Sequence, residues 1–273
     1  MFSKLIKSED ENLNVELFSF MDLVNLSTNK ESLIKKILEE IPPNKEIGFA
    51  GYDTKESLKL FLDWTVDKPE DLENINEFKI EELIEKIQES INKISKKTEK
   101  RKINLFIFPS FNNFIHEKLM GVSGFCEWEN EITLVINPNS NWKENFDFSF
   151  GHEISHSLSK FYKNERSIGS WLIFDGIAEH FQEKEITGKK SFIIESISKE
   201  KAMEIFQEIK SHLNDENEEL HRELFYGSGK YPLWAGYCIG YYLLENYFKN
   251  EDFNIFEVIY KSPKEIIQKV SDF

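Results

Sequence analysis

The sequence holds only two cysteines in 273 residues, Cys126 and Cys238. They lie far apart and form no CxxC pair, so the spacing gives no support for a disulfide framework. We expect two free thiols in a reducing compartment, with one long-range disulfide as the alternative. Neither cysteine has a surrounding motif that indicates a nucleophile.

Positive charge is also scarce. The chain carries 34 Lys and Arg against 49 Asp and Glu, which gives a formal net charge of −15. Nucleic-acid binders need a basic surface that displaces the counterions of phosphate, so this class of protein is disfavoured. Binding to an anionic membrane surface is disfavoured for the same reason. We therefore predict no nucleic-acid partner and no membrane partner.

Long apolar runs are missing as well. The first residues, MFSKLIKSEDENLNVELF, have no sustained apolar core and no small-residue cleavage site, which argues against a signal peptide. The best candidate for a membrane span, residues 233–248, is too short and contains Glu245 and Asn246. We expect a cytoplasmic protein.

What the chain does contain is the composition of a globular protein. Hydrophobic residues make up 40% and charged residues 30%, and 24 phenylalanines supply large side chains for a core. The length suits one large domain or two modest ones. No internal repeat or low-complexity linker divides it.

Hydrophobic periodicity predicts an α+β protein in three regions. Residues 1–100 are expected to be mostly helical. Residues 101–190 are expected to form the core that contains the HExxH and Glu helices, and residues 191–273 to form a helical subdomain that closes the cleft. We expect the first 41 residues to be mostly helical. The expected helices are 30–41, 55–66, 80–94, 146–162, 171–183 and one starting at Pro263. Expected strands are 104–108, 122–128 and 131–136, the last two joined by a turn at Glu129-Asn130.

The motif that carries chemistry is His152-Glu153-Ile154-Ser155-His156, an HExxH sequence. Residues four apart lie on one face of a helix, so both imidazoles can reach one ion, and zinc accepts imidazole nitrogens. Glu153 projects beside this face, where it can hold a metal-bound water and accept its proton as a general base. The alternative without a metal site is an exposed helix with two solvated histidines.

The opposite face of the same helix argues against that alternative. Ile154, Leu158 and Phe161 lie there and are expected to pack on the core, so the ligand face points away from the packing face.

A catalytic zinc site usually has three protein ligands and one water. The segment WLIFDGIAEHFQ, residues 171–182, reads as a second helix, and we favour its Glu179, 23 residues after His156, over His180 as the third ligand. Asp175, one turn earlier, is placed to accept the second N–H of a ligating histidine. A solvated surface acid is the equal alternative for Asp175.

The oxyanion of a tetrahedral intermediate needs a donor such as Tyr or His near the metal. Candidates are Tyr237, Tyr231 and His221, of which we select Tyr237, although tyrosines that only fill an interface are at least as plausible for each. Gly236 and Gly240 predict that the helix of Tyr237 packs closely on another.

The segments HEISH, DGIAEH and YPLWAGYCIGYYLLENY resemble the DUF2268 family of predicted zinc-dependent proteases, over roughly residues 100–273. The first two are similar to gluzincins, in which a Glu on a second helix completes an HExxH site. The chain departs from the DUF2268 pattern at Asp175, where a Glu is expected.

The resemblance implies a zincin-like fold, a small mixed sheet under the HExxH helix with helical regions on either side. In such folds the edge strand before that helix pairs with extended substrate, and residues 131–136 occupy that place in the order. The alternative is that they form an ordinary edge or central strand.

We therefore predict a metallopeptidase with one zinc ion per chain and a peptide or protein substrate. Zinc on His152, His156 and Glu179 would activate water, and Glu153 would take its proton. The alternative is a catalytically silent zincin scaffold that binds a peptide or protein partner, against which an intact Glu153 argues. Manganese, cobalt or nickel could also occupy such a ligand set.

Overall fold

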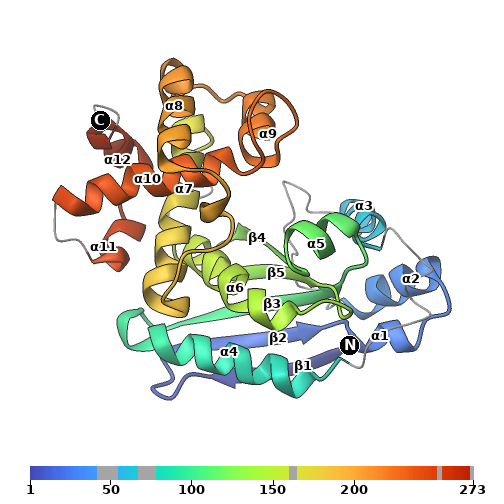
Figure 1. The fold of residues 1–273 in the computed structure, drawn as a ribbon. Coiled ribbons are helices and arrows are strands. Elements are labelled where there is room, and N and C mark those ends of the chain that lie inside the picture. The colour runs from blue at the N-terminus through green and yellow to red at the C-terminus, as the bar shows by residue number, and fades with distance from the viewer. Residues whose placement is uncertain (42–54, 67–77, 160–164, 251–253, 271–273) are drawn as a thin grey trace. The chain divides into compact units, whose positions relative to one another are not determined.

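The computed structural model describes residues 1–41, 55–66, 78–159, 165–250 and 254–270 (Figure 1). It is a mixed α and β structure with one five-stranded sheet and many helices. The chain forms two compact units, Met1–Ser157 and Leu158–Phe273. Their boundary falls inside the core region predicted for residues 101–190.

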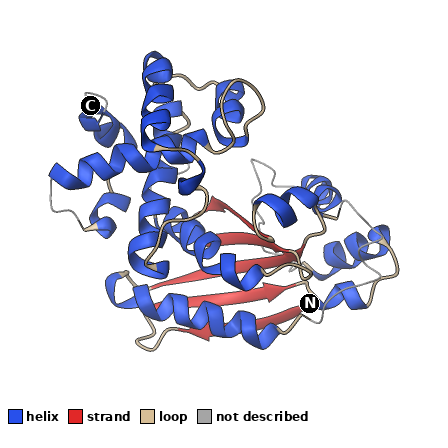
Figure 2. Ribbon diagram, viewed as in Figure 1, coloured by secondary structure: helices blue, strands red, loops and turns tan. Residues whose placement is uncertain are grey.

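The sheet belongs to the first unit (Figure 2). Its strand order is β1-β2-β3-β5-β4. Neighbours β2 and β3, and β3 and β5, run parallel, whereas the two outer pairs are antiparallel. The strands are β1 (Phe2–Lys7), β2 (Leu13–Ser19), β3 (Arg101–Pro109), β4 (Val122–Trp128) and β5 (Glu131–Ile136).

The prediction of a mostly helical start is wrong for the first 20 residues, which form β1 and β2. The reason is a period-two pattern in β2, where buried Leu13, Val15 and Leu17 alternate with half-buried Asn14 and Glu16. The later helices of this region are confirmed as α2 (Lys30–Glu40), α3 (Lys55–Thr65) and α4 (Ile80–Ile94).

The expectation that residues 131–136 form the edge strand is also wrong. They form β5, which lies between β3 and β4, and β4 is the edge strand. In β5 the continuous run Ile132–Ile136 is buried, as in strands covered on both faces. The hairpin itself is confirmed, and Asn130 adopts a φ of 65° in its turn.

Aromatic stacking fixes one side of the sheet. Phe18 stacks on Phe106 with ring centroids 5.1 Å apart, and Phe20 stacks on Phe108 at 4.7 Å. Phe61 of α3 meets Phe108 edge-on. Each fully buried phenylalanine stabilises the fold by about 1.5–3 kcal/mol, so this cluster anchors α2 and α3 on the sheet. The short elements α1 (Asp22–Asn25), η2 (Ser95–Lys97) and α5 (Asn113–Lys118) complete the unit with α6 (Trp142–Leu158).

The second unit is helical. After α7 (Ile168–Phe181) come a π-helical turn, η3 (Gln182–Thr187), and the helices α8 (Lys199–Ile209), α9 (Glu218–Tyr226), α10 (Ala235–Asn250), α11 (Ile255–Ile259) and α12 (Pro263–Val270). Two short 3-10 turns, η4 (Ile194–Ser196) and η5 (Lys210–His212), connect them. The predicted helix start at Pro263 is confirmed.

Two glycines bring α7 and α10 into backbone contact. A Cβ built on Gly176 would lie 2.4 Å from the carbonyl carbon of Gly240, and one built on Gly240 would lie 1.9 Å from the carbonyl oxygen of Leu172. Any side chain at either position would therefore push the helices apart. The close packing predicted for Gly240 is confirmed, and none of the described helices is long and apolar enough to cross a membrane.

Candidate metal centre

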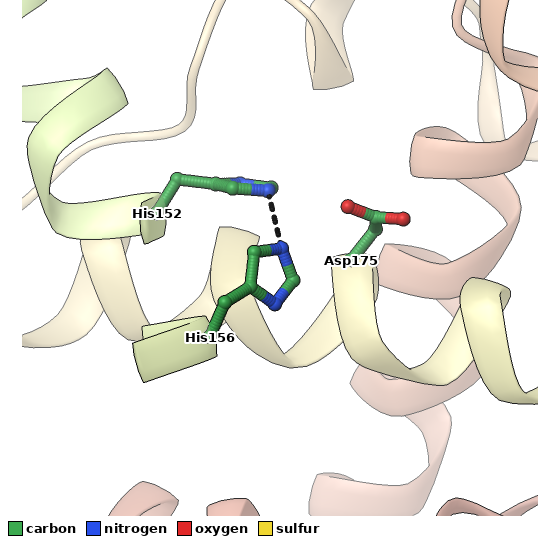
Figure 3. A group of neighbouring side chains, drawn as sticks. All are labelled: His152, His156 and Asp175. Atoms are coloured by element: carbon green, nitrogen blue, oxygen red, sulfur yellow. Dashed lines mark hydrogen bonds between the residues drawn. The ribbon is translucent and has the colours of Figure 1, made fainter. Parts of the chain in front are cut away.

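The HExxH motif lies on the last two turns of α6 in the first unit (Figure 3). His152 and His156 are 9% and 4% exposed, and their Nε2 atoms are 3.0 Å apart. Two imidazoles on one tetrahedral zinc ion, each at 2.0–2.1 Å, would have nitrogens about 3.3 Å apart. The donor type and the spacing therefore both fit a shared zinc ion.

Packing holds this helix in place. Ile154 and Leu158 are 0% and 1% exposed, which confirms the predicted packing face, whereas Phe161 lies outside the described residues. Asn145 of α6 donates from Nδ2 to the carbonyl oxygens of Leu119 and Val122, at the start of β4. These bonds fix the ligand helix relative to the edge strand.

A half-buried arginine holds the C-terminal end of α6. Arg101 donates from Nη1 to the carbonyl oxygen of Ser157 at 3.2 Å and to Oδ1 of Asn130 at 3.4 Å. The carbonyls at a helix C-terminus lack intrahelical partners and carry partial negative charge, so a guanidinium stabilises them. Arg101 thus connects the turn of the β4–β5 hairpin to the residue after His156.

Glu153 lies directly beneath the edge strand. It is 6% exposed, and a Cβ built on Gly124 of β4 would lie 2.4 Å from its Cγ and 2.7 Å from its Oε1. Only a glycine at this strand position lets the carboxylate approach so closely. Sequence reasoning missed Gly124, although a glycine inside a strand pattern is a known signal of close backbone approach.

The same glycine offers backbone groups to the open edge. The Asn137 N–H donates to the carbonyl oxygen of Gly121 across the β4–β5 pair. Because hydrogen-bonding direction alternates along an antiparallel strand, the N–H and C=O of Gly124 point away from β5. Within the described residues no further strand of the sheet lies beyond β4.

The two predicted acids are on α7 in the second unit, and they differ in their surroundings. Glu179 is 3% exposed, and its Oε2 accepts a hydrogen bond of 2.6 Å from the Ser191 hydroxyl. Asp175, which Figure 3 labels, is half-buried. Trp171 and Asp175 are the two residues of α7 that are not buried, and they lie one turn apart on the same side.

The three candidate oxyanion donors also lie in the second unit. Tyr237 is half-buried on α10, and its ring meets Phe225 edge-on with centroids 5.1 Å apart. The His221 ring lies 3.9 Å from that of Trp171. Tyr231 follows α9 in a loop, under the ammonium of Lys230. His116 and His212 are exposed.

The cysteines carry no reactive site. Both are free and buried, which agrees with the expectation of two thiols. Burial raises the pKa of Cys238 to about 11, so this thiol stays protonated and is a poor nucleophile.

Comparison with known proteins supports a zinc protease family. The family model described as predicted Zn-dependent protease (DUF2268) matches residues 83–268 of the 273. This range includes the HExxH motif, β4 and both acids of α7. No curated protein and no solved structure matches the chain. Because the match covers more than half of its length, the chain belongs to the DUF2268 family of predicted zinc-dependent proteases.

Proposed function

We propose that this protein is a zinc-dependent peptidase that hydrolyses peptide bonds in an extended peptide or protein substrate. The observation that carries the proposal is the arrangement in the first unit. Two imidazole nitrogens converge to 3.0 Å, and Glu153 lies between them in sequence and under the glycine of an edge strand. An antiparallel edge strand next to an HExxH helix is the arrangement of a zincin-like fold.

For the third protein ligand we propose Asp175 ahead of Glu179. The Glu179 carboxylate is buried and accepts a short hydrogen bond from Ser191 within its own unit. Asp175 is on the accessible side of α7 and is half-buried. Together with His152 and His156 it would give two nitrogens and one carboxylate oxygen, a donor set typical of catalytic zinc.

The substrate is proposed to bind as an additional strand along β4. The outward N–H and C=O of Gly124 would pair with the peptide backbone, which brings a scissile bond over Glu153. Main-chain pairing recognises any extended peptide, and the side-chain preference would come from the surfaces next to β4.

In this mechanism Glu153 moves the proton. As the oxygen of water bonds to the carbonyl carbon, Glu153 accepts a proton from that water. Glu153 then donates the proton to the amine nitrogen as the carbon–nitrogen bond breaks. Zinc, when bound, supplies the Lewis acid that polarises the carbonyl and lowers the pKa of water.

Metal content tests the proposal. The wild-type protein is purified without added metal and compared with His156→Ala and with His116→Ala, an exposed histidine of α5. We expect about one zinc per chain in the wild type and in the His116 variant, and none in the His156 variant. No zinc in the wild type, even after zinc is added, would overturn the metallopeptidase proposal.

Turnover separates a peptidase from a binding scaffold. A peptide library is incubated with the zinc-loaded wild type and with Glu153→Gln, and the products are identified by mass spectrometry. Cleavage by the wild type but not by the variant supports the proposal. Zinc binding with no cleavage of any peptide would favour a scaffold that only binds a partner.

A further inference from the structure

The two faces of the edge strand β4 carry different groups. Gly124 faces α6, where Glu153 fills the space of the missing side chain. Side chains alternate along a strand, so the neighbouring Phe125 points to the other face of the sheet. The contacts of Phe125 agree with this, because it packs against the phenylalanine cluster that anchors α2 and α3. A carboxylate therefore lies on one face of β4 and an aromatic ring on the other.

An aromatic row leads from α3 to β4. The Phe61 ring meets Phe125 edge-on with centroids 5.8 Å apart, and the Trp64 ring lies 6.3 Å from that of Phe61. Phe61 is buried, whereas Phe125 is half-buried and Trp64 is 44% exposed. Leu60, one turn before Trp64 on the same side of α3, is exposed as well. The row thus presents apolar surface next to the strand proposed to bind the substrate.

Hydrogen bonds fix the end of α3 that carries Trp64. Asn112 donates from Nδ2 to the Trp64 carbonyl oxygen at 3.1 Å, and the Phe111 N–H donates to the Thr65 carbonyl oxygen at 2.7 Å. The last carbonyls of a helix lack intrahelical partners, so these bonds satisfy them and attach α3 to the segment that follows β3. All of these residues belong to the first unit, as do β4 and the HExxH motif.

Strand pairing decides which substrate side chain meets Phe125. The backbone groups of Gly124 point to the open edge, so Phe125 would face an antiparallel peptide in a pair without hydrogen bonds. In such a pair the Cα atoms lie about 4.5 Å apart, and the two side chains are on the same face. The substrate residue next to the one that pairs with Gly124 would therefore place its side chain against the Phe125 ring.

We propose that Phe125 determines substrate specificity and selects a large apolar side chain, such as Leu, Met or Phe, at this substrate position. The inference rests on the proposed function and names its substrate class, extended peptides with a large apolar residue close to the cleaved bond. Contact with the ring removes apolar surface of the substrate from water, which stabilises the bound peptide. A charged side chain would lose hydration against the same ring.

The products of the peptide library measure this preference. Peptides cut by the zinc-loaded wild type are aligned on the cleaved bond, and we expect large apolar residues to dominate one position close to it. Two matched peptides then carry Leu or Ser at that position. We expect kcat/KM to be about 10- to 100-fold higher for the Leu peptide. Equal kcat/KM values for the two peptides would overturn the proposal.

Phe125→Ala tests whether this ring causes the preference. We expect the ratio of kcat/KM between the Leu and Ser peptides to fall about tenfold, because the apolar contact is lost. A purely structural defect would lower both values together and leave their ratio unchanged. Leu26→Ala, which shortens an exposed leucine after α1, is the control and should keep the wild-type ratio. A wild-type ratio in Phe125→Ala would overturn the assignment.

Phe125→Leu gives a second test that keeps an apolar side chain on the core cluster. Because leucine is smaller than phenylalanine, it leaves more room for the substrate side chain. We expect kcat/KM for a Phe peptide to rise relative to that for the Leu peptide, and an unchanged ratio would contradict the proposal. This variant also serves if Phe125→Ala does not fold, as judged by its melting curve.

The two proposals fail in different ways. If the wild type binds no zinc or cleaves no peptide, the peptidase proposal fails and the specificity assignment fails with it. If the wild type cleaves peptides and Glu153→Gln does not, the peptidase proposal holds. An unchanged preference in both Phe125 variants then removes only the assignment of Phe125.

Discussion

Gly124 of the edge strand leaves the space that the Glu153 carboxylate occupies, since a Cβ on Gly124 would lie 2.4 Å from Cγ of Glu153. No real Cβ contact is so short, so a side chain at position 124 has to displace either the strand or the acid. The relationship joins the strand proposed to bind the substrate to the residue proposed to move the proton.

We therefore predict that Gly124→Ala reduces kcat about 10²-fold, because a displacement of about 1 Å in a catalytic group has an effect of this order. Zinc content should stay at the wild-type value, since the three atoms nearest to a Cβ at position 124 all belong to Glu153. Steady-state kinetics and elemental analysis measure the two effects. Ser123→Ala is the neighbouring control, and equal kcat values for both variants would contradict the proposed role of Gly124.

Glu153→Gln should retain zinc and lose turnover. The amide has nearly the shape of the carboxylate but cannot accept a proton, so kcat is expected to fall about 10²- to 10⁴-fold. The measurement is single-turnover hydrolysis beside elemental analysis of the same sample. Loss of zinc together with activity would instead make Glu153 a metal ligand.

Asp175 and Glu179 can be separated by their effects on metal affinity. Asp175→Ala should remove zinc, because it deletes a proposed ligand. Glu179→Gln should keep one zinc per chain. Its zinc affinity should be about 10- to 100-fold lower if Glu179 does not bind zinc itself and only hydrogen-bonds to a residue that does. Competition with a chelator measures both affinities, and the reverse order would restore Glu179 as the ligand.

Arg101→Met should destabilise the first unit by about 1–3 kcal/mol, because the Ser157 carbonyl oxygen loses its charged donor. We expect zinc to dissociate faster, since the last turn of α6 carries His156. Lys102→Met is the matched control: it removes one positive charge from an exposed pair with Glu16, and should change stability by less than about 0.5 kcal/mol. Urea unfolding and chelator-driven zinc release provide the measurements.

We expect the buried His180 to make the free energy of unfolding depend on pH. Burial lowers its pKa to about 3, from 6.5 in the unfolded chain. Between these values the unfolded state binds a proton that the folded state does not, so the free energy of unfolding falls as the pH drops from about 6.5 to about 3. The slope from this residue is at most about 1.4 kcal/mol per pH unit.

Urea titrations at pH 4, 5, 6 and 7 test the prediction for His180. His180→Phe should flatten the dependence, whereas His212→Gln, which changes an exposed histidine, should leave it unaltered. An unchanged slope in His180→Phe would mean that other groups cause the acid sensitivity.

The spacing of residues by itself determined the local parts of this protein. Four-residue spacing on a helix places His152 and His156 together whatever surrounds them, and the 3.6-residue pattern fixed the helices at 30–40 and 80–94 almost to the residue. The turn of the β4–β5 hairpin was predictable for the same local reason.

Only the tertiary structure decided which strand lies at the edge and which side chains meet. Strand order depends on non-local pairing, so the sequence could not show that β4, and not β5, is outermost. The contact of Gly124 with Glu153 and the reach of Arg101 to Ser157 join segments about 30 and 56 residues apart. Such contacts depend on how the sheet and the helix pack together. The periodicity of hydrophobic residues along the chain does not predict them.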